Sequence, residues 1–484
     1  MKRNNCLAMA VILALLLGVL TGCQATSDPS GEETKKADTN APWVETQSPQ
    51  KSFEELTEKE RAFYLFNDNL ESYSSYTVDM TISATGVIQG MPFSITGGGK
   101  MISIDNPTEV FYYEDANEHI DIGNGTLVQD IVMKSGYANG KMFSYQSADG
   151  EQDGVYSALT DAEWRTYMAE KEEADDDLTL SDELVGSVTL TTTEEGYTAT
   201  FTDFTEKGLS EMNKGYGDMS SVMGDDPSDV VLTISVDAEK KPRSMTAQFL
   251  YEGGTDAPTF VIDGIYRDVN QTKSIAVDLS GYRNVGDLRV IERAERAIGK
   301  IAEASAATWE CYESCTVWQG ETQLNVSDVT VNASFTDGKD GYRFSLTDSK
   351  GGKARYEGGL MYSQSAGQAE ESAACDEQAA RSYLNETYVD FAELSVHGAS
   401  GVTKTENGYE ITLSDVDMSE FTPILSVFSA TENDVRNAQS FVAVELKDGN
   451  LAYLSYQVHF DLITPQGTVS VGYLKDIASI QYTE

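Results

Sequence analysis

The chain has 484 residues, and its 79 Asp and Glu residues against 34 Lys and Arg residues give a formal net charge of −45. Nucleic-acid binding requires the opposite sign of charge, so this class of function is excluded. Anionic lipid headgroups would also repel the folded part of such a chain. The length exceeds that of one ordinary domain and indicates two or three domains.

The first residues have the layout of an export signal. Lys2 and Arg3 precede an apolar run over residues 7–20, which is too short for an ordinary membrane-spanning helix. The run ends in LTGC, which resembles a bacterial lipobox with Cys23 as its cysteine. The resemblance implies removal of residues 1–22 and attachment of diacylglycerol to the Cys23 sulfur; the alternative is an ordinary signal peptide with a chance cysteine. Two acyl chains suffice for stable attachment, so we expect a lipid-anchored protein on the extracytoplasmic face of the bacterial cell membrane.

An acidic segment over residues 23–51 follows the signal. It is rich in Ser, Thr, Glu, Asp and Pro, and it has almost nothing to bury. Such a composition cannot offset chain entropy by forming a core. The sequence therefore predicts a disordered acidic tether between the anchor and the first folded part.

One short pattern occurs twice in the chain. Residues 196–204 read GYTATFTDF and residues 408–416 read GYEITLSDV, and in both stretches every second residue is bulky or apolar. Successive side chains of a strand point to opposite faces of a sheet, so both stretches are predicted to be half-buried β-strands.

Three further pairs of segments recur in the same order. Residues 70–78 match 309–317, residues 137–144 (YANGKMFS) match 356–363 (YEGGLMYS), and residues 232–252 match 442–461. The spacing between copies falls steadily along the chain, from 239 residues at the first pair to 210 at the last. If the matches arose by chance, the spacing between copies would vary without any order along the chain. The sequence therefore predicts two copies of one α+β module, at residues 52–283 and 287–484.

Helix signals occur at equivalent places in the two copies. Ser52 and Glu55 form a predicted capping box at the start of the first copy, and Asp287 is a predicted N-cap at the start of the second. Further helices are expected at residues 160–173, 377–394, 206–223 and 418–438, the last interrupted at Pro423.

The order of elements behind a lipidated cysteine resembles the LolA/LolB and LppX-type lipoprotein-carrier superfamily, including LppX-like lipoproteins of Gram-positive bacteria. The resemblance is carried by ESYSSYTVDMTIS, by the Y-x-x-G-x-M-F motif, by the GYxxxFTDF strand and by the paired C-terminal strands. It implies that each module is a curved antiparallel half-barrel sheet packed on helices, with an apolar cavity that can hold acyl chains. Family members usually carry one such domain, whereas this chain carries two.

Six residues are candidates for the apolar side of these sheets. They belong either to a packed core or to a ligand cavity, and they are Tyr197, Phe201, Tyr409, Leu413, Met142 and Met361.

Catalytic and metal-binding motifs are not evident. His119, His397 and His459 are far apart in the sequence, with no cysteine or carboxylate at metal-ligand spacing. Asp203 and Asp415 hold matching places in the two copies, either as an acid pair or as polar strand ends before a helix. We expect no enzyme activity, no metal and no cofactor.

Three cysteines remain after Cys23 is lipidated, and an oxidising exterior allows one disulfide among them. Cys375 with Cys311 or Cys315 is the candidate pairing, and the spacing does not choose between the two. The alternative is that all three are small buried residues.

Two functions fit these observations. The first is a membrane-anchored lipoprotein that binds a lipid or another hydrophobic ligand in half-barrel cavities. The second is a non-enzymatic envelope adaptor that docks a protein or a cell-wall partner through its paired sheets.

Overall fold

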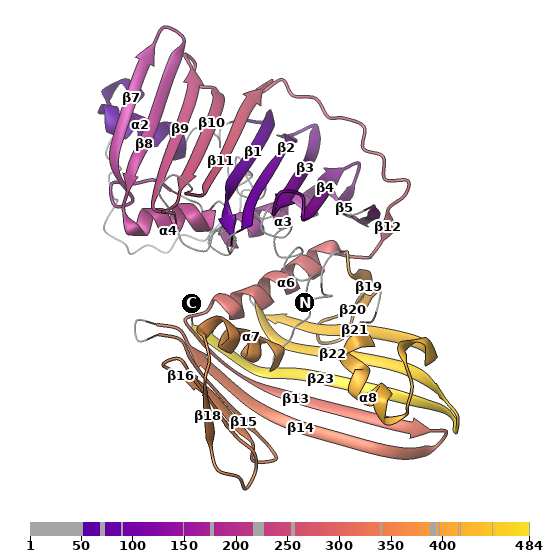
Figure 1. The fold of residues 1–484 in the computed structure, drawn as a ribbon. Coiled ribbons are helices and arrows are strands. Elements are labelled where there is room, and N and C mark those ends of the chain that lie inside the picture. Colours follow the sequence, from indigo (N-terminus) through magenta and orange to yellow (C-terminus); the bar gives the residue numbers. More distant parts are fainter. Residues whose placement is uncertain are drawn as a thin grey trace, which may run out of the picture. The chain divides into compact units, whose positions relative to one another are not determined.

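The structure is a computed structural model, and it describes residues 52–67, 73–88, 91–148, 150–174, 179–215, 227–252, 257–338, 341–387, 394, 397–414, 416, 418–447 and 449–483. The signal peptide, Cys23 and the tether lie outside these residues. The chain divides into two compact units near Gly281, and the short segment Val155–Ala158 groups with the second unit. Each unit contains one large, open, mostly antiparallel sheet (Figure 1).

Within the described residues the first sheet has twelve strands, in the order β12-β6-β5-β4-β3-β2-β1-β11-β10-β9-β8-β7. Their bounds are β1 Ser75–Ile88, β2 Met91–Asn106, β3 Glu109–Ile122, β4 Leu127–Ala138, β5 Lys141–Ala148, β6 Glu151–Ala158, β7 Val185–Thr193, β8 Gly196–Phe204, β9 Asp229–Asp237, β10 Pro242–Leu250, β11 Thr259–Arg267 and β12 Arg283–Asn284. Only β12 pairs in parallel, with β6, among the strand pairs described.

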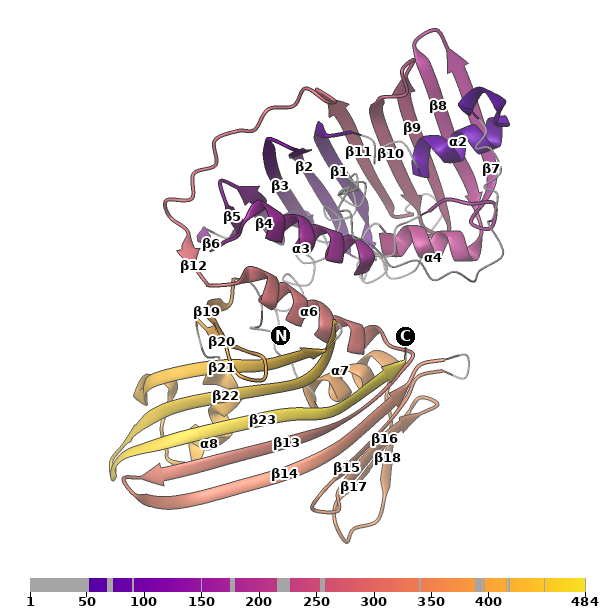
Figure 2. The same cartoon turned by 180° about the vertical axis from the view of Figure 1, so that it is seen from behind.

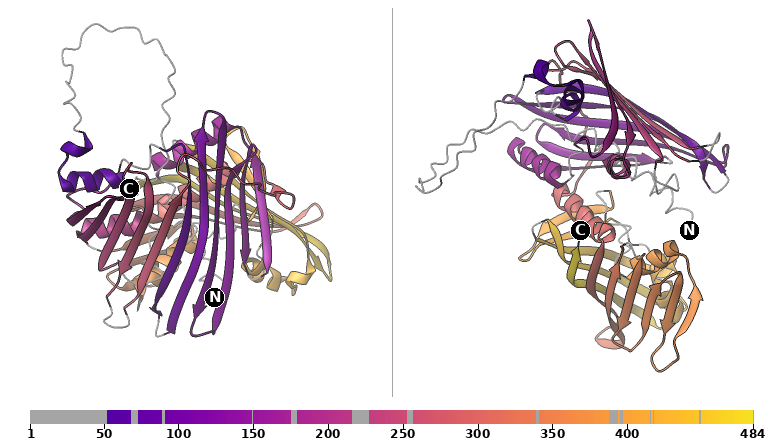
Figure 3. Two further views of the ribbon diagram at one scale, coloured as in Figure 1. Left: turned by 90° about the horizontal axis from the view of Figure 1, so that it is seen from above. Right: turned by 90° about the vertical axis from the view of Figure 1, so that its left-hand side faces the viewer.

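The second sheet has eleven strands in the described part of the chain, in the order β18-β17-β16-β15-β14-β13-β23-β22-β21-β20-β19. Their bounds are β13 Ala306–Gln319, β14 Thr322–Thr336, β15 Arg343–Asp348, β16 Lys353–Glu357, β17 Leu360–Gln364, β18 Glu371–Ala374, β19 Ala399–Lys404, β20 Tyr409–Leu413, β21 Val435–Lys447, β22 Asn450–Thr464 and β23 Gly467–Thr483. Figure 3 shows that the strands of each sheet form an open, twisted layer.

The two sheets share one topology, which confirms the predicted fold class of two tandem α+β modules. Leaving out β12, the first sheet from β6 to β7 and the second from β18 to β19 have the same strand order. All four sequence pairs lie on equivalent strands: β1 with β13, β4–β5 with β16–β17, β8 with β20, and β9–β10 with β21–β22. The spacing between the two copies of each segment falls along the chain because strands and connections are shorter in the second copy. For example, β15–β18 are shorter than their counterparts β3–β6.

The alternating pattern of the sequence produces one continuous apolar face in the first sheet. Phe201, Leu232, Ala247, Ile262 and Ile82 are successive partners across β8, β9, β10, β11 and β1. All five are buried. Because partners in an antiparallel pair share a face, the period of two in each strand brings these side chains into one row.

Helices cover the apolar face of the first sheet. They are η1 (Phe53–Glu55), α2 (Glu58–Asn67), α3 (Asp161–Ala174) and α4 (Glu206–Gly215). α2 lies across β7–β9 (Figure 2), where Phe63 stacks on Phe201 at 5.9 Å between ring centroids. The predicted capping box at Ser52 is confirmed, since its backbone N–H donates to the Glu55 carboxylate at 2.8 Å.

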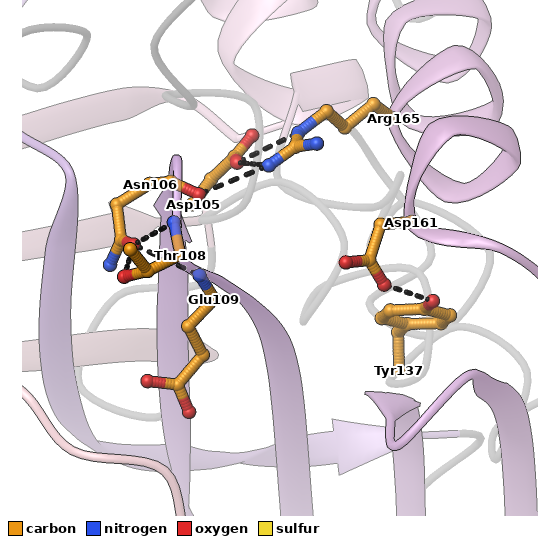
Figure 4. A network of polar contacts seen from close by, with 7 residues as sticks. All are labelled: Asp105, Asn106, Thr108, Glu109, Tyr137, Asp161 and Arg165. Atoms are coloured by element: carbon orange, nitrogen blue, oxygen red, sulfur yellow. Dashed lines mark hydrogen bonds and ion pairs between the residues drawn. The ribbon is translucent and has the colours of Figure 1, made fainter.

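Polar contacts of Asp161 and Arg165 hold α3 against the first sheet (Figure 4). The Tyr137 hydroxyl donates to Asp161 Oδ1 at 2.6 Å, and the Arg165 guanidinium donates to Asp105 Oδ1 at 2.8 Å. The Trp164 ring stacks on Tyr137, with centroids 5.0 Å apart. α3 begins where the sequence predicts a helix, and Thr160 forms a capping box there: Glu163 N donates to Thr160 Oγ1 and Thr160 N donates to Glu163 Oε2.

The helices of the second unit are α6 (Leu288–Glu303), α7 (Glu377–Thr387), η3 (Met418–Phe421), α8 (Thr422–Val427) and η4 (Glu432–Asp434). Asp287 caps α6 as predicted, because its side chain accepts from Arg289 N. α6 buries Leu288, Ile291, Ala294 and Ala297, and it contacts β19, β21 and β22.

The helix predicted over residues 418–438 is wrong in its second half. α8 ends at Val427, Ser429 has a positive φ of 53°, and β21 already begins at Val435. Pro423 stands at the start of α8, where its missing N–H is tolerated, so it begins a short helix and does not interrupt a long one. Tertiary pairing of β21 with β22 overrides the local helical pattern.

Candidate functional site

A groove of about 760 Å³ lies on the second sheet, and most of its lining consists of alternate residues of β13, β22 and β23. Asn437 of β21 also lines it, as do Phe460, Val471 and Tyr473, which lie between the alternate residues. This volume is within the range of roughly 300–1,000 Å³ that small-molecule sites occupy. The groove is on the polar face of these strands. In β22 the even-numbered residues from Leu454 to Leu462 are buried, whereas Tyr453, Gln457, His459 and Asp461 face the groove.

Strand register brings the groove residues into three rows. From β22 through β23 to β13, the rows are Asp461–Ser470–Trp318, His459–Gly472–Thr316 and Gln457–Leu474–Ser314. Directly opposed residues on one face of a sheet have Cβ atoms about 5 Å apart. The rows therefore place side chains from β13 and from β22 within reach of one ligand.

Asp461 is held in a defined orientation at one end of the groove. Its Oδ1 accepts from the Ser470 hydroxyl at 2.7 Å, and its Oδ2 accepts from Asn437 Nδ2 at 2.8 Å. These two hydrogen bonds, Asn437 first, lower the pKa of the Asp461 carboxyl, because they favour its ionised form. Asp461 is therefore an oriented, ionised acceptor, and each of its oxygens retains a further lone pair.

A second carboxylate is positioned at the other end of the groove. This carboxylate is Asp476, whose Oδ1 accepts a hydrogen bond from the Tyr453 hydroxyl at 2.9 Å. Nearby on β22, Gln457 Nε2 donates to Ser455 Oγ at 3.2 Å. Burial, together with the Asp476 hydrogen bond, raises the pKa of Tyr453, so its hydroxyl keeps its proton.

Two ring side chains border the polar floor. Trp318 is 39% exposed, although tryptophan is usually highly buried. The His459 ring lies over Gly472: a Cβ atom at position 472 would be only 3.4 Å from His459 Nδ1. The imidazole therefore lies directly over the β23 backbone at this position.

The opposite, apolar face of the same strands is filled by the unit's own side chains. Phe421, between η3 and α8, makes edge-on contacts with Phe460 and Tyr473, with centroids 5.4 Å apart in both cases. Phe421 and Leu425 are 2% and 3% exposed. Helical residues therefore pack where the sequence predicted an apolar hollow in this part of the second sheet.

The six predicted cavity residues are distributed over both units. Phe201 is fully buried against Phe63 and Phe66, and Tyr197 contacts Phe53 edge-on at 5.3 Å. Met142 and Leu413 are buried, and Tyr409 and Met361 are half-buried. None of the six lines the polar groove.

Two buried acids of β3, Glu114 and Glu118, interrupt the apolar face of the first sheet, and Glu114 accepts a hydrogen bond from the Tyr112 hydroxyl. Glu118 on β3 is 4% exposed and pairs with Gly97 on β2 and Ile131 on β4. Neither of its carboxylate oxygens has a hydrogen-bond partner among the described residues. Burial raises the pKa of Glu118 to about 8, so the group is mostly protonated at neutral pH.

Among the described residues, no group of three or more His, Cys, Asp or Glu side chains is placed to hold a metal ion. His119 pairs with Asp130 on the neighbouring strand, and Asp203 lies at the exposed end of β8. Its counterpart Asp415 lies outside the described residues.

The disulfide of Cys375 with Cys311 or Cys315 is not formed, and all three cysteines are free. Cys311 and Cys315 are on β13, whereas Cys375 follows β18, five strands away in the sheet. At about 4.8 Å per strand this separation is on the order of 24 Å, far beyond the roughly 7 Å that a disulfide allows between Cα atoms. Burial raises the pKa of Cys311 to about 11, so its thiol is unreactive.

The groove was missed in the sequence, although a signal for it exists. Tyr453, Gln457, His459 and Asp461 alternate along a predicted strand, and they combine aromatic, amide and acidic side chains on its polar side. Such a face differs from an ordinary solvated one, which is mainly Lys, Glu and Thr. The partners on β13 could not be found, because they lie some 140 residues earlier in the chain.

Among the described residues, no helix has the length and apolar character needed to cross a membrane. Cys23 and the proposed signal peptide are not among these residues, so their role stays a prediction.

Comparisons with known proteins assign no family to this chain. No family model matches it, and no curated protein matches it. Solved structures give weak matches: a putative AttH from Nitrosomonas europaea is 8% identical, covers 90% of this chain and 98% of its own, and has a TM-score of 0.13. A transferrin-binding protein B mutant from Haemophilus parasuis is 9% identical, with coverages of 84% and 76% and a TM-score of 0.13. A DUF3598-family protein of unknown function from Nostoc punctiforme is 7% identical, with coverages of 86% and 97% and a TM-score of 0.11. Likenesses at these TM-scores carry no argument.

Proposed function

We propose that this chain is a non-enzymatic lipoprotein of the outer face of the cell membrane that binds a polar partner of the envelope through the open face of its second sheet. The observation that carries the proposal is the position of the groove. It lies on the polar face of β13, β22 and β23, and the apolar face of β22 and β23 is occupied by Phe421. A site built in this way suits a polar partner and not an acyl chain.

The anchor and the net charge fit this role. Lipidation at Cys23 would hold the protein at the membrane, and a tether of about 28 residues spans on the order of 30 Å as a random coil. The charge of −45 would keep the sheets away from anionic headgroups and leave the polar face free for a partner.

In-cell photo-crosslinking tests the proposal. A photoreactive residue replaces Thr316, which lines the groove, in the full-length protein produced in its own cells. The matched control replaces Thr308, an exposed threonine on the same face of β13 but outside the groove. We expect an adduct with a cell-wall fragment or an envelope protein at position 316 and not at position 308. Adducts at neither position, or equally at both, would contradict a binding role for this face.

Binding of a hydrophobic ligand by the first sheet is the second candidate, and Glu118 favours it. A buried carboxyl group without a partner is costly, so a bound amphiphile with a hydroxyl or ester group could supply the missing hydrogen bond. Native mass spectrometry of the protein purified from its own membranes would show an adduct of constant mass, lost in Glu118→Leu and retained in Glu109→Gln, an exposed position on the same strand. If the wild-type protein carries no amphiphile, this function is ruled out.

A further inference from the structure

The geometry points to a neutral saccharide as the ligand of the groove on β13, β22 and β23. This inference rests on the proposed function and specifies the chemical class of its partner. The side chains that the three rows bring together support it through their hydrogen-bonding groups, their charge and their apolar surface.

The hydrogen-bonding groups of the groove both donate and accept. Asn437 and Gln457 present amide groups, and Thr316 and Ser470 present hydroxyls, all of which can act in both roles. Asp461 and Asp476 only accept when ionised. A ligand that satisfies this lining must itself carry many groups that donate and accept, and adjacent sugar hydroxyls do so. An amine donates only, so it would leave the amide N–H groups without acceptors.

The charge of the groove selects against acidic ligands. Two carboxylates line it, and none of its lining residues is Lys or Arg. Hydrogen bonds from Asn437 and Ser470 hold Asp461 in its ionised form. An anionic group in the groove would meet two like charges without a compensating cation. Neutral sugars are therefore favoured over uronic or phosphorylated ones.

An apolar platform completes the site. Trp318 is exposed at the end of the Asp461–Ser470 row, and its indole offers a flat face beside oriented polar groups. A pyranose ring has a face of C–H groups and a rim of hydroxyls. Stacking of the C–H face on Trp318 would direct the rim toward Asp461, whose two oxygens each have a lone pair left for a sugar hydroxyl. His459 and Tyr453 border the remainder of the groove.

The test uses the full mature chain with Cys23→Ser, so that it is soluble. Saturation-transfer NMR and titration calorimetry measure binding of four probes: chitotriose and maltotriose as neutral saccharides, trigalacturonate as an acidic one, and spermine as a cation. We expect at least one neutral saccharide to bind and trigalacturonate to bind at least tenfold more weakly, as about 1.4 kcal/mol of charge repulsion would produce.

Four variants identify the site. Trp318→Ala should weaken the binding of the saccharide about tenfold, the loss of one ring contact, whereas Trp318→Phe should retain most of the affinity. Asp461→Asn keeps the shape of the side chain and should weaken binding at least tenfold. Glu310→Gln, an exposed change on the same face of β13 outside the groove, should have no effect. Circular dichroism of each variant checks that the sheet is folded.

The inference is overturned if neither neutral saccharide binds at concentrations up to about 10 mM, which is weaker than any useful affinity. It is also overturned if trigalacturonate or spermine binds as tightly as the neutral probes, or if Trp318→Ala binds normally. If the saccharides fail while crosslinking at position 316 captures an envelope protein, the proposed function holds and the ligand class is wrong. If crosslinking also fails, both are wrong.

Discussion

At the scale of single residues, Glu118 shows how burial changes chemistry. It lies between Gly97 and Ile131 on the apolar face of the first sheet, and desolvation raises its pKa to about 8 from its ordinary value of 4.5. The folded protein therefore binds one more proton than the unfolded chain across this interval. Stability falls with pH wherever the folded state holds more protons. This destabilising contribution begins near pH 4.5 and is complete near pH 8.

Glu118→Gln should remove this dependence. Relative to the variant, the wild-type protein should lose up to about 1.4 kcal/mol per pH unit between about pH 5 and about pH 8. Calorimetric melting of both proteins across this range measures the difference, with Glu109→Gln as the exposed control on β3. Parallel pH profiles for wild type and Glu118→Gln would show that Glu118 is solvated in the folded protein.

At the scale of elements, α3 is attached to the first sheet by both aromatic and polar contacts. Trp164 is 6% exposed and stacks on Tyr137. The polar contacts join Tyr137 to Asp161 and Arg165 to Asp105 (Figure 4). The capping box at Thr160 explains where the helix begins. It does not explain which surface the helix covers, because that depends on Tyr112 and Tyr137 of the sheet.

Trp164→Ala should destabilise the attachment of α3 by about 3–5 kcal/mol, the usual loss for removing a buried indole. Hydrogen exchange measured by mass spectrometry should show faster exchange in α3 and in the adjoining parts of β3 and β4. Thr166→Ala, an exposed change on the same helix, should alter the free energy of local opening by less than about 0.5 kcal/mol. Unchanged protection in Trp164→Ala would mean that the polar contacts alone hold the helix.

At the scale of the whole molecule, the chain has a duplicated sheet behind a predicted anchor signal. The duplication is visible as one strand order, β6 to β7 in the first sheet and β18 to β19 in the second. The two copies nevertheless differ. The apolar face of the first contains Glu118, whereas the second carries an aromatic and acidic groove on its polar face. One fold thus presents two different surfaces.

Lipidation at Cys23 predicts how the whole protein partitions. In detergent phase separation of cell extracts, the wild-type protein should enter the detergent phase, and Cys23→Ser should remain in the aqueous phase, because two acyl chains provide stable attachment. Cys6→Ser is the matched control, since Cys6 would leave with the signal peptide. Detergent partitioning of Cys23→Ser would point to another means of attachment.

The amino-acid sequence by itself determined the strands, the duplication and the helix starts. These depend on local features: the period of two in GYTATFTDF, the repeated order of segments, and capping boxes that span four residues. Where tertiary pairing competed with a local pattern, as at residues 435–438, the local prediction failed.

Only the tertiary structure decided which residues line the groove and whether the cysteines lie close enough to form a disulfide. Trp318 and Asp461 are distant in sequence, and they share a row because β23 pairs with both β13 and β22. The same strand order separates Cys375 from Cys311 and Cys315. Local periodicity specifies which face a side chain occupies, but not which strand will lie beside it, because that choice depends on the packing of the whole sheet.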